Sequence, residues 1–126
     1  MSHTIIYNPE THIIEATVQG TVNLNEMKEI FYEGVQIAME KGIFLSLSDF
    51  REATSNLSTM DIYNLPKILS DIAIPLGLNI YKFKRAIVTA KDSSDFHFAE
   101  NVTSNQGQNA KFFNDIEEAK KWLSEK

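Results

Sequence analysis

The chain is organised around the stretch Leu45-Ser46-Leu47-Ser48-Asp49-Phe50-Arg51-Glu52-Ala53-Thr54-Ser55. Residues 43–47 form a short, nearly continuous apolar run between Gly42 and Asp49. Such a run is typical of an interior strand that is covered on both faces. The polar residues that follow predict a loop over 49–57, and a helix is expected to begin near Ser58. This stretch carries the densest group of reactive side chains in the sequence.

The residues before this stretch predict a hairpin and a helix. Alternating apolar and polar residues predict strands over 4–8 and 12–19, and Gly20 is expected to end the second strand. Asn23 is a good N-cap for a helix over 24–41. Lys41 and Gly42 are a typical end for that helix, because Gly42 is free to adopt a positive φ.

The residues after it continue the alternation of helices and strands. Ser58 and Asp61 predict the start of a helix that Pro66 either kinks or divides near Asn64. A strand over 86–90, a helix from about 92 to 105, a strand over 110–113 and a final helix capped by Asn114 or Asp115 follow. The order β-β-α-β-α-β-α-β-α indicates an α/β fold with a mixed, mainly parallel sheet.

Composition limits the class of protein. The chain has 126 residues, of which 43% are hydrophobic, which fits a single domain over 1–126. A formal net charge of −5 argues against nucleic-acid binding. Cysteine is absent, so the sequence offers no disulfide or thiolate site. No signal peptide and no apolar run long enough to insert stably in a membrane is recognised, so we expect a cytoplasmic protein.

The order of elements resembles that of STAS domains, the fold of anti-sigma-factor antagonists, and more closely that of small bacterial SpoIIAA-like proteins. Four features carry the resemblance over nearly the whole chain. They are the hairpin ending in Gly20, the run Leu47-Ser48-Asp49-Phe50-Arg51-Glu52-Ala53, the strand Arg85-Ala86-Ile87-Val88, and the closing element Phe113-Asn114-Asp115-Ile116-Glu117-Glu118-Ala119-Lys120-Lys121-Trp122-Leu123.

The resemblance implies an interaction or regulatory module more than an enzyme. Antagonists of this fold carry a phosphorylatable serine in an Asp-Ser-Ser-Gly type of motif after the third strand. Asp49 matches the aspartate of that motif, but the Ser-Ser-Gly is absent here. Asp92-Ser93-Ser94 imitates the motif but follows the fourth strand of the prediction.

The candidate polar site lies at the carboxyl ends of the predicted strands, where open α/β sheets bind ligands near the point at which strand order reverses. Its candidate binding residues are Asp49, Arg51, Glu52, Ser55, Ser58, Asp92 and Ser93. The structural alternative is that Asp49 caps the loop, that Arg51 pairs with an acid, and that Ser58 is a plain N-cap. No catalytic residue is assigned.

A second candidate site is an apolar pocket lined by Ile68, Ile72, Phe96 and Phe98. Phe96 and Phe98 are two residues apart, so a helix cannot bury both on one narrow stripe. The apolar connection over 72–78 either packs in the core or forms a partner or lipid surface. His3, His12 and His97 lack metal-ligand spacing, although His3 and His12 are candidates to meet across the hairpin, and we predict neither a metal nor a cofactor.

Three functions remain open at this point. The first is a non-catalytic STAS-like module that binds a protein partner or small ligand at 49–58. The second is a carrier or sensor of a small apolar or lipid-like ligand. The third is an enzyme that uses Asp49, Arg51 and Glu52. A homodimer is also expected from exposed strand edges and apolar surface.

Overall fold

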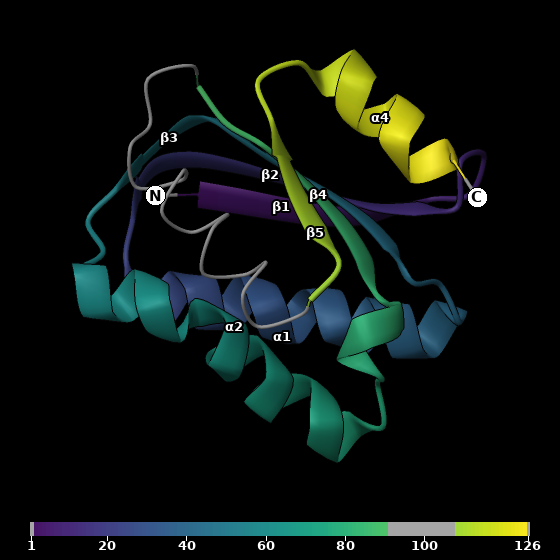
Figure 1. The fold of residues 1–126 in the computed structure, drawn as a ribbon, viewed down its shortest axis with the longest axis horizontal. Helices are drawn as coiled ribbons and strands as arrows, with labels where there is room; N and C mark the ends of the chain where they lie inside the picture. The colour runs from purple at the N-terminus through teal and green to yellow at the C-terminus, as the bar shows by residue number, and fades with distance from the viewer. Residues whose placement is uncertain (1, 91–107, 126) are drawn as a thin grey trace.

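The computed structural model describes residues 2–90 and 108–125. These residues form a sheet of five strands in the order β1-β2-β3-β4-β5, in which β1 is antiparallel to β2 and every other neighbouring pair is parallel. The sheet lies between a layer formed by α1 and α2 and a second layer formed by α4 (Figure 1). The elements are β1 Ser2–Asn8, β2 Ile13–Val22, α1 Leu24–Lys41, β3 Leu45–Ser55, α2 Thr59–Ala73, η1 Ile74–Leu76, η2 Ile80–Lys82, β4 Lys84–Val88, β5 Ala110–Phe113 and α4 Ile116–Ser124.

The structure confirms the predicted helix over 24–41, and the residues at both of its ends act as expected. The side chain of Asn23 accepts a hydrogen bond from the backbone N–H of Glu26, which satisfies one of the free donors of the first turn. At the other end Gly42 has φ 67°, the left-handed conformation that a glycine adopts without strain. The chain then turns back and enters β3.

The predicted loop over 49–57 is wrong for most of its length, because β3 continues through Asp49 to Ser55. The reason lies in β2, which does not stop at Gly20 but runs to Val22. Gly20, with φ 85°, lies inside the strand just after an irregularity in the β2–β3 register between Thr17 and Gln19. The long β2 therefore offers a parallel partner to every residue of the polar stretch except a few at the bulge.

The second helix is one element, so of the two predicted alternatives the division near Asn64 is wrong, while the kink at Pro66 stays a prediction. A capping box starts it: Ser58 Oγ accepts from the N–H of Asp61, and the Asp61 carboxylate accepts from the N–H of Ser58. Pro66 lies inside the helix and is buried. Burial of the proline ring offsets part of the loss of one backbone hydrogen bond.

The predicted fourth strand is shifted by two residues, since β4 begins at Lys84 and ends at Val88. The apolar connection before it is divided between the two expected roles. Leu78 and Ile80 are buried in the core, whereas Ile74 is 65% exposed. The predicted helix over 92–105 lies outside the described residues.

The last strand and helix confirm the prediction. Strand β5 has the predicted bounds, and Asp115 caps α4 by accepting from the N–H groups of Glu117 and Glu118. The ammonium of Lys84 donates to the carbonyl oxygens of Trp122, at 2.6 Å, and of Glu125, at 3.0 Å. It also lies 4.5 Å from the centroid of the Trp122 ring, so the end of α4 is fixed to the start of β4.

The two faces of the sheet are packed differently. The face toward α4 has one cluster of buried residues, formed by Ile13, Leu47, Ala86, Val88, Ala119 and Leu123. The face toward α1 and α2 has two clusters. One contains Ile14, Val35, Ala38, Leu69, Ala73, Leu78, Ile80 and Phe83, and the other contains Val18, Val22, Met27, Ile30, Phe50 and Ala53. The fully buried core on this face is therefore interrupted, and the partly buried Ile5 and Phe31 pack against both clusters.

Candidate functional site

A cavity of about 110 Å³ occupies the interruption between the two clusters. Residues of both clusters form its walls, for example Val35 and Leu69 from one and Met27 and Phe50 from the other. The cavity is partly open to solvent and its walls are mostly apolar. Protein cores contain few voids larger than a water molecule, so a space of this size is a feature to be explained.

Two neighbouring rows of sheet residues form the floor of the cavity. One row is Ile14, Ser46, Arg85 and Ala110, and the next is Ala16, Ser48, Ile87 and Phe112. Because side chains alternate along a strand, the residues between them on β3 and β4 point to the other face and pack under α4. The floor therefore spans the middle of the sheet from β2 to β5.

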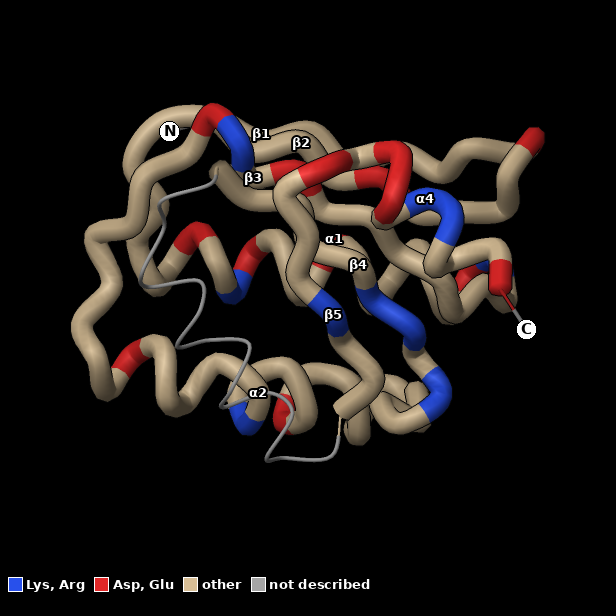
Figure 2. The backbone as a smooth tube through the Cα atoms, turned by 45° about the horizontal axis from the view of Figure 1, so that its top comes forward, with Lys and Arg blue, Asp and Glu red and all other residues tan. Residues whose placement is uncertain are grey.

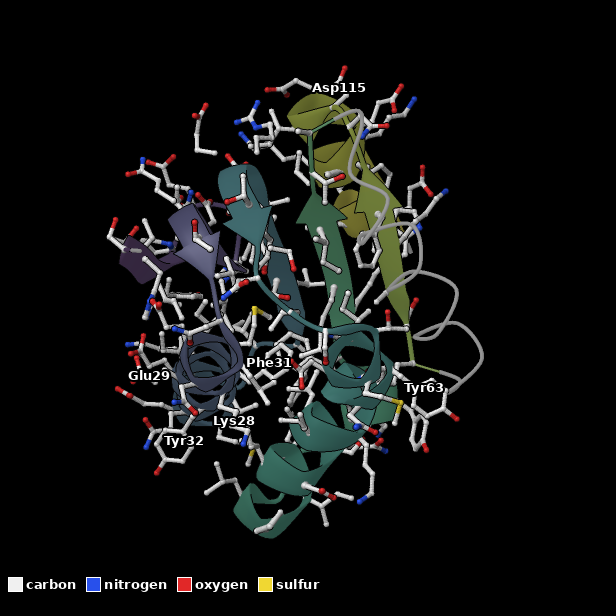
Figure 3. The ribbon with its side chains drawn as sticks, turned by 90° about the vertical axis from the view of Figure 1, so that its left-hand side faces the viewer. Lys28, Glu29, Phe31, Tyr32, Tyr63 and Asp115 are labelled. Atoms are coloured by element: carbon white, nitrogen blue, oxygen red, sulfur yellow. The ribbon has the colours of Figure 1, made fainter. Side chains whose placement is uncertain are left out.

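The roof comes from α1 and α2. Figure 3 shows Phe31 pointing from α1 toward the space between the helices and the sheet, while the next residue, Tyr32, points outward. Gly34, one turn further on, also lines the cavity. A Cβ atom built at Gly34 has no neighbour within 4 Å, so the space beside this glycine is open. From α2 the cavity is lined by Leu65, Pro66 and Leu69.

The floor carries three polar side chains on an otherwise apolar face: Ser46, Ser48 and Arg85. Arg85 is half-buried as a whole, but its Nε atom is shut off from solvent and has no hydrogen-bond partner. Burial lowers the pKa of Arg85 to about 10, so the guanidinium still carries its charge at neutral pH.

The sequence alone did not single out Arg85 as a functional residue. The available signal was its position: a strand that alternates Arg85 and Ile87 on one face with Ala86 and Val88 on the other carries a cation where an apolar residue is usual. On β3, Ser46 and Ser48 likewise place polar side chains on a face where apolar residues are usual.

Asp49 and Arg51, the centre of the predicted polar site, are paired with each other within β3. Arg51 Nε donates to Asp49 Oδ1 at 2.9 Å, and Arg51 Nη2 donates to Oδ2 at 2.7 Å. These bonds hold the pKa of Asp49 below its usual value and raise that of Arg51. Neither residue lines the cavity. The arrangement matches the alternative in which Arg51 pairs with an acid.

The serines of the predicted site have local structural contacts. Ser58 is the N-cap of α2, and Ser55 Oγ accepts from the backbone N–H of Leu57 at 3.1 Å. Glu52 is exposed on β3, opposite Gln19. The structure thus places Asp49, Arg51, Glu52 and Ser55 along one strand, not in a loop. Asp92 and Ser93 lie outside the described residues.

The predicted apolar pocket also differs from the cavity. Helix α2 does not present Ile68 and Ile72 to it, and Ile72 packs against the cluster of Ile14 and Leu69. Phe96 and Phe98 lie outside the described residues. The face of α2 that lines the cavity is adjacent to the predicted one. It carries Leu65, Pro66 and Leu69, with the buried Pro66 at its centre.

Two further expectations need correction. The strand order of the described sheet runs from β1 to β5 without reversal. This sheet therefore has no reversal point at which a ligand could bind. His3 and His12 do not meet, since His3 lies 3.2 Å from the carboxylate of Glu33 and His12 lies 2.8 Å from the hydroxyl of Tyr7. Among residues 2–90 and 108–125, no group of three or more histidines and carboxylates is placed to bind a metal ion.

The sheet order and the placement of the helices define a SpoIIAA-like α/β fold. The chain is similar in structure to an uncharacterised protein of the DUF3478 family with a SpoIIAA-like fold from Shewanella loihica PV-4. The TM-score is 0.51 and the sequence identity 20%, over 97% of this chain and 92% of the other. At this identity the similarity concerns the fold alone.

Comparisons of sequence add no relative. No protein-family model matches the chain, and no curated protein matches it. Within the part of the chain that the structure describes, no helix has the length and apolar character needed to cross a bilayer.

Proposed function

We propose that this protein is a non-catalytic binding module that holds a small, mainly apolar molecule in the cavity between α1, α2 and the sheet. The observation that carries the proposal is the interruption of the core on that face by about 110 Å³ of unfilled space. A cavity of ~150 Å³ in another protein takes up benzene, so a single ring or a short alkyl chain is the appropriate ligand size.

Gly34 supports the proposal, because it keeps the cavity open at a cost to the helix. Glycine in a helix interior is less favourable than alanine by about 1 kcal/mol. Nothing lies within 4 Å of the position where a Cβ would stand, so packing in the free protein does not require a glycine there. A side chain much larger than alanine at this position would take up space that the proposed ligand occupies.

The other sites give weaker support to other functions. Asp49 and Arg51 are paired by two side-chain hydrogen bonds and lie outside the cavity, so the cavity does not support an enzyme that uses them. Partner binding at 49–58, a homodimer and a cytoplasmic location stay predictions. Acidic and basic residues are intermixed along α1 and α2 (Figure 2), unlike the one-signed basic face that binds nucleic acid.

The test is a titration with 1-hexanol, a neutral probe of suitable size, followed by ¹H–¹⁵N correlation spectra. We expect shifts at cavity residues such as Phe31, Ser46 and Leu69, with a Kd on the order of 0.1–1 mM for a ligand of about seven heavy atoms. Gly34→Leu should abolish these shifts. Four added carbons occupy roughly 100 Å³ on the scale of six benzene carbons in ~150 Å³, which fills most of the space.

Gly34→Ala is the matched control. It adds one methyl group in open space, so it should keep hexanol binding and stabilise the fold by up to about 1 kcal/mol. Hexanol binding by Gly34→Leu at the wild-type affinity would contradict the proposal. So would the absence of shifts at the cavity residues in the wild type at about 10 mM hexanol, because the expected Kd is well below that concentration.

A further inference from the structure

Among the described residues that line the cavity, Arg85 is the one with a charged side chain. It belongs to the row of floor residues on β4, between Ser46 of β3 and Ala110 of β5. The strand keeps apolar residues on its opposite face, toward α4. The position of Arg85 therefore directs a guanidinium to the cavity side of the sheet.

A buried glutamine fixes the guanidinium in place. Arg85 Nη2 donates to Gln108 Oε1 at 2.6 Å. Gln108, which is 8% exposed, donates through its Nε2 to the carbonyl oxygen of Pro66 at 2.8 Å and lies 3.3 Å from Ser70 Oγ. The partner of Arg85 is thus neutral and is itself fixed to α2. The arrangement orients the charge but does not neutralise it.

One further donor of Arg85, its Nε–H, is left without an acceptor. Its Nε is buried and has no partner, and none of the carboxylates in 2–90 and 108–125 forms an ion pair with it. A buried cation without a counter-ion is unfavourable, and a donor without an acceptor adds to that cost. An anion brought into the cavity would supply the missing counter-charge.

We propose that the ligand of this cavity is a small apolar carboxylate, with its head group at Arg85 and its apolar part in the space beside Gly34. This inference rests on the function proposed above and specifies the class of ligand. A planar guanidinium matches a carboxylate, and the hydroxyls of Ser46 and Ser48 lie on the same floor as further donors. A phosphate ester would require more donors than this small, mostly apolar space provides.

The test compares three probes that share a six-carbon chain: hexanoate, 1-hexanol and hexylamine. At neutral pH they carry a negative, a zero and a positive charge at the same end. We expect the wild type to bind hexanoate at least about tenfold more tightly than hexanol, and hexylamine more weakly than either, because a hydrogen bond between charged groups is worth that factor or more.

Substitution of Arg85 should remove the discrimination. In Arg85→Gln the ratio of the Kd for hexanol to the Kd for hexanoate should fall to about one, since no charge is left to favour the anion. Arg85→Lys retains a charge but lacks the planar guanidinium that matches a carboxylate, so its ratio should lie between those of the wild type and Arg85→Gln. Arg51→Gln is the matched control, because Arg51 lies outside the cavity, and it should keep the wild-type ratio.

A measurement on the wild type does not depend on the folding of any variant. The sequence contains two arginines, Arg51 and Arg85, so a spectrum of arginine Nε–H groups has two signals. Hexanoate should shift the signal of Arg85 and leave that of Arg51 in place, while hexanol should shift neither strongly.

The outcomes separate this inference from the proposed function. If the wild type binds hexanol and hexanoate equally, with no shift of the Arg85 signal, the carboxylate assignment is overturned while the apolar cavity stands. If the wild type binds neither probe, the proposed function fails and the inference with it. A preference for hexanoate that persists in Arg85→Gln also overturns the assignment to Arg85.

Discussion

Replacement of Arg85 by methionine should stabilise the unliganded protein. Burial lowers the pKa of Arg85 well below its usual value, to about 10. A tenfold change in an acid constant corresponds to about 1.4 kcal/mol, so burial costs the charged form roughly 3 kcal/mol. Both the folded and the unfolded chain carry the charge below pH 10, so the full cost is present at pH 7. Methionine is unbranched and apolar and removes that cost.

The loss of the hydrogen bond to Gln108 opposes the gain. A bond from a charged donor contributes about 1.5–3 kcal/mol, which leaves a net stabilisation of up to about 1.5 kcal/mol. For a chain of 126 residues each kcal/mol corresponds to about 4 °C in the unfolding midpoint, so the midpoint should rise by up to about 6 °C. Thermal and urea unfolding followed by circular dichroism measure both quantities.

The opposite sign would refute the reasoning. If the free protein already neutralised Arg85, the substitution would break a buried ion pair and cost about 3–5 kcal/mol. A fall in the midpoint of more than about 8 °C in Arg85→Met would therefore show that the charge is compensated without a ligand. Arg51→Met is the control: Arg51 is 43% exposed in its pair with Asp49, so its loss should change stability by less than about 1 kcal/mol.

Two further predictions concern the polar stretch that organises the chain. Ser58→Ala removes one half of the capping box of α2 and should lower the free energy of unfolding by about 1 kcal/mol, measured by urea unfolding; a change below about 0.3 kcal/mol would contradict the capping role. Asp49→Asn should lower the free energy of unfolding by about 0.5–1 kcal/mol at pH 7. This value allows for solvent screening at the exposed Arg51. Because the hydrogen bond from Arg51 lowers the folded-state pKa of Asp49, this contribution is present above pH 3.8 and is lost as pH falls through that lower pKa. A wild-type advantage over Asp49→Asn that does not shrink below pH 3.8 would contradict that assignment.

Local signals predicted the elements whose ends are set by local chemistry. Asn23 and Gly42 fix the two ends of α1, and Asp115 fixes the start of α4, through hydrogen bonds or backbone conformations that involve only neighbours in sequence. The parallel order of β2 to β5 followed from the alternation of strands and helices. These are the features that a single sequence encodes most directly.

The length of β3 depended on a partner distant in sequence. Polar residues from Asp49 to Ser55 resemble a loop when considered alone, but β2 extends to Val22 and supplies their hydrogen-bond partners. Phe50 and Ala53 are buried against Val18 and Val22 through this pairing. Tertiary context therefore overrode the local preference, as it often does in strands.

The cavity was missed for a different reason. Sequence periodicity shows which helix face is apolar but not whether two apolar faces meet without a gap. The sequence predicted a pocket on α2, and the structure has one beside that helix, but lined by Leu65, Pro66 and Leu69. Chain packing decided which of the neighbouring apolar stripes faces the sheet.

The two faces of strands β3 and β4 can be compared directly to judge the role of the cavity. Their α4 face carries Leu47, Ala86 and Val88 in one continuous cluster. Their other face, one residue step away, carries Ser46, Ser48 and Arg85 around unfilled space. The strands, the solvent conditions and the requirement for stability are the same for both faces, so stability alone does not explain the difference. The function proposed above would account for it, because it needs open space and a positive charge that has no ion-pair partner among residues 2–90 and 108–125.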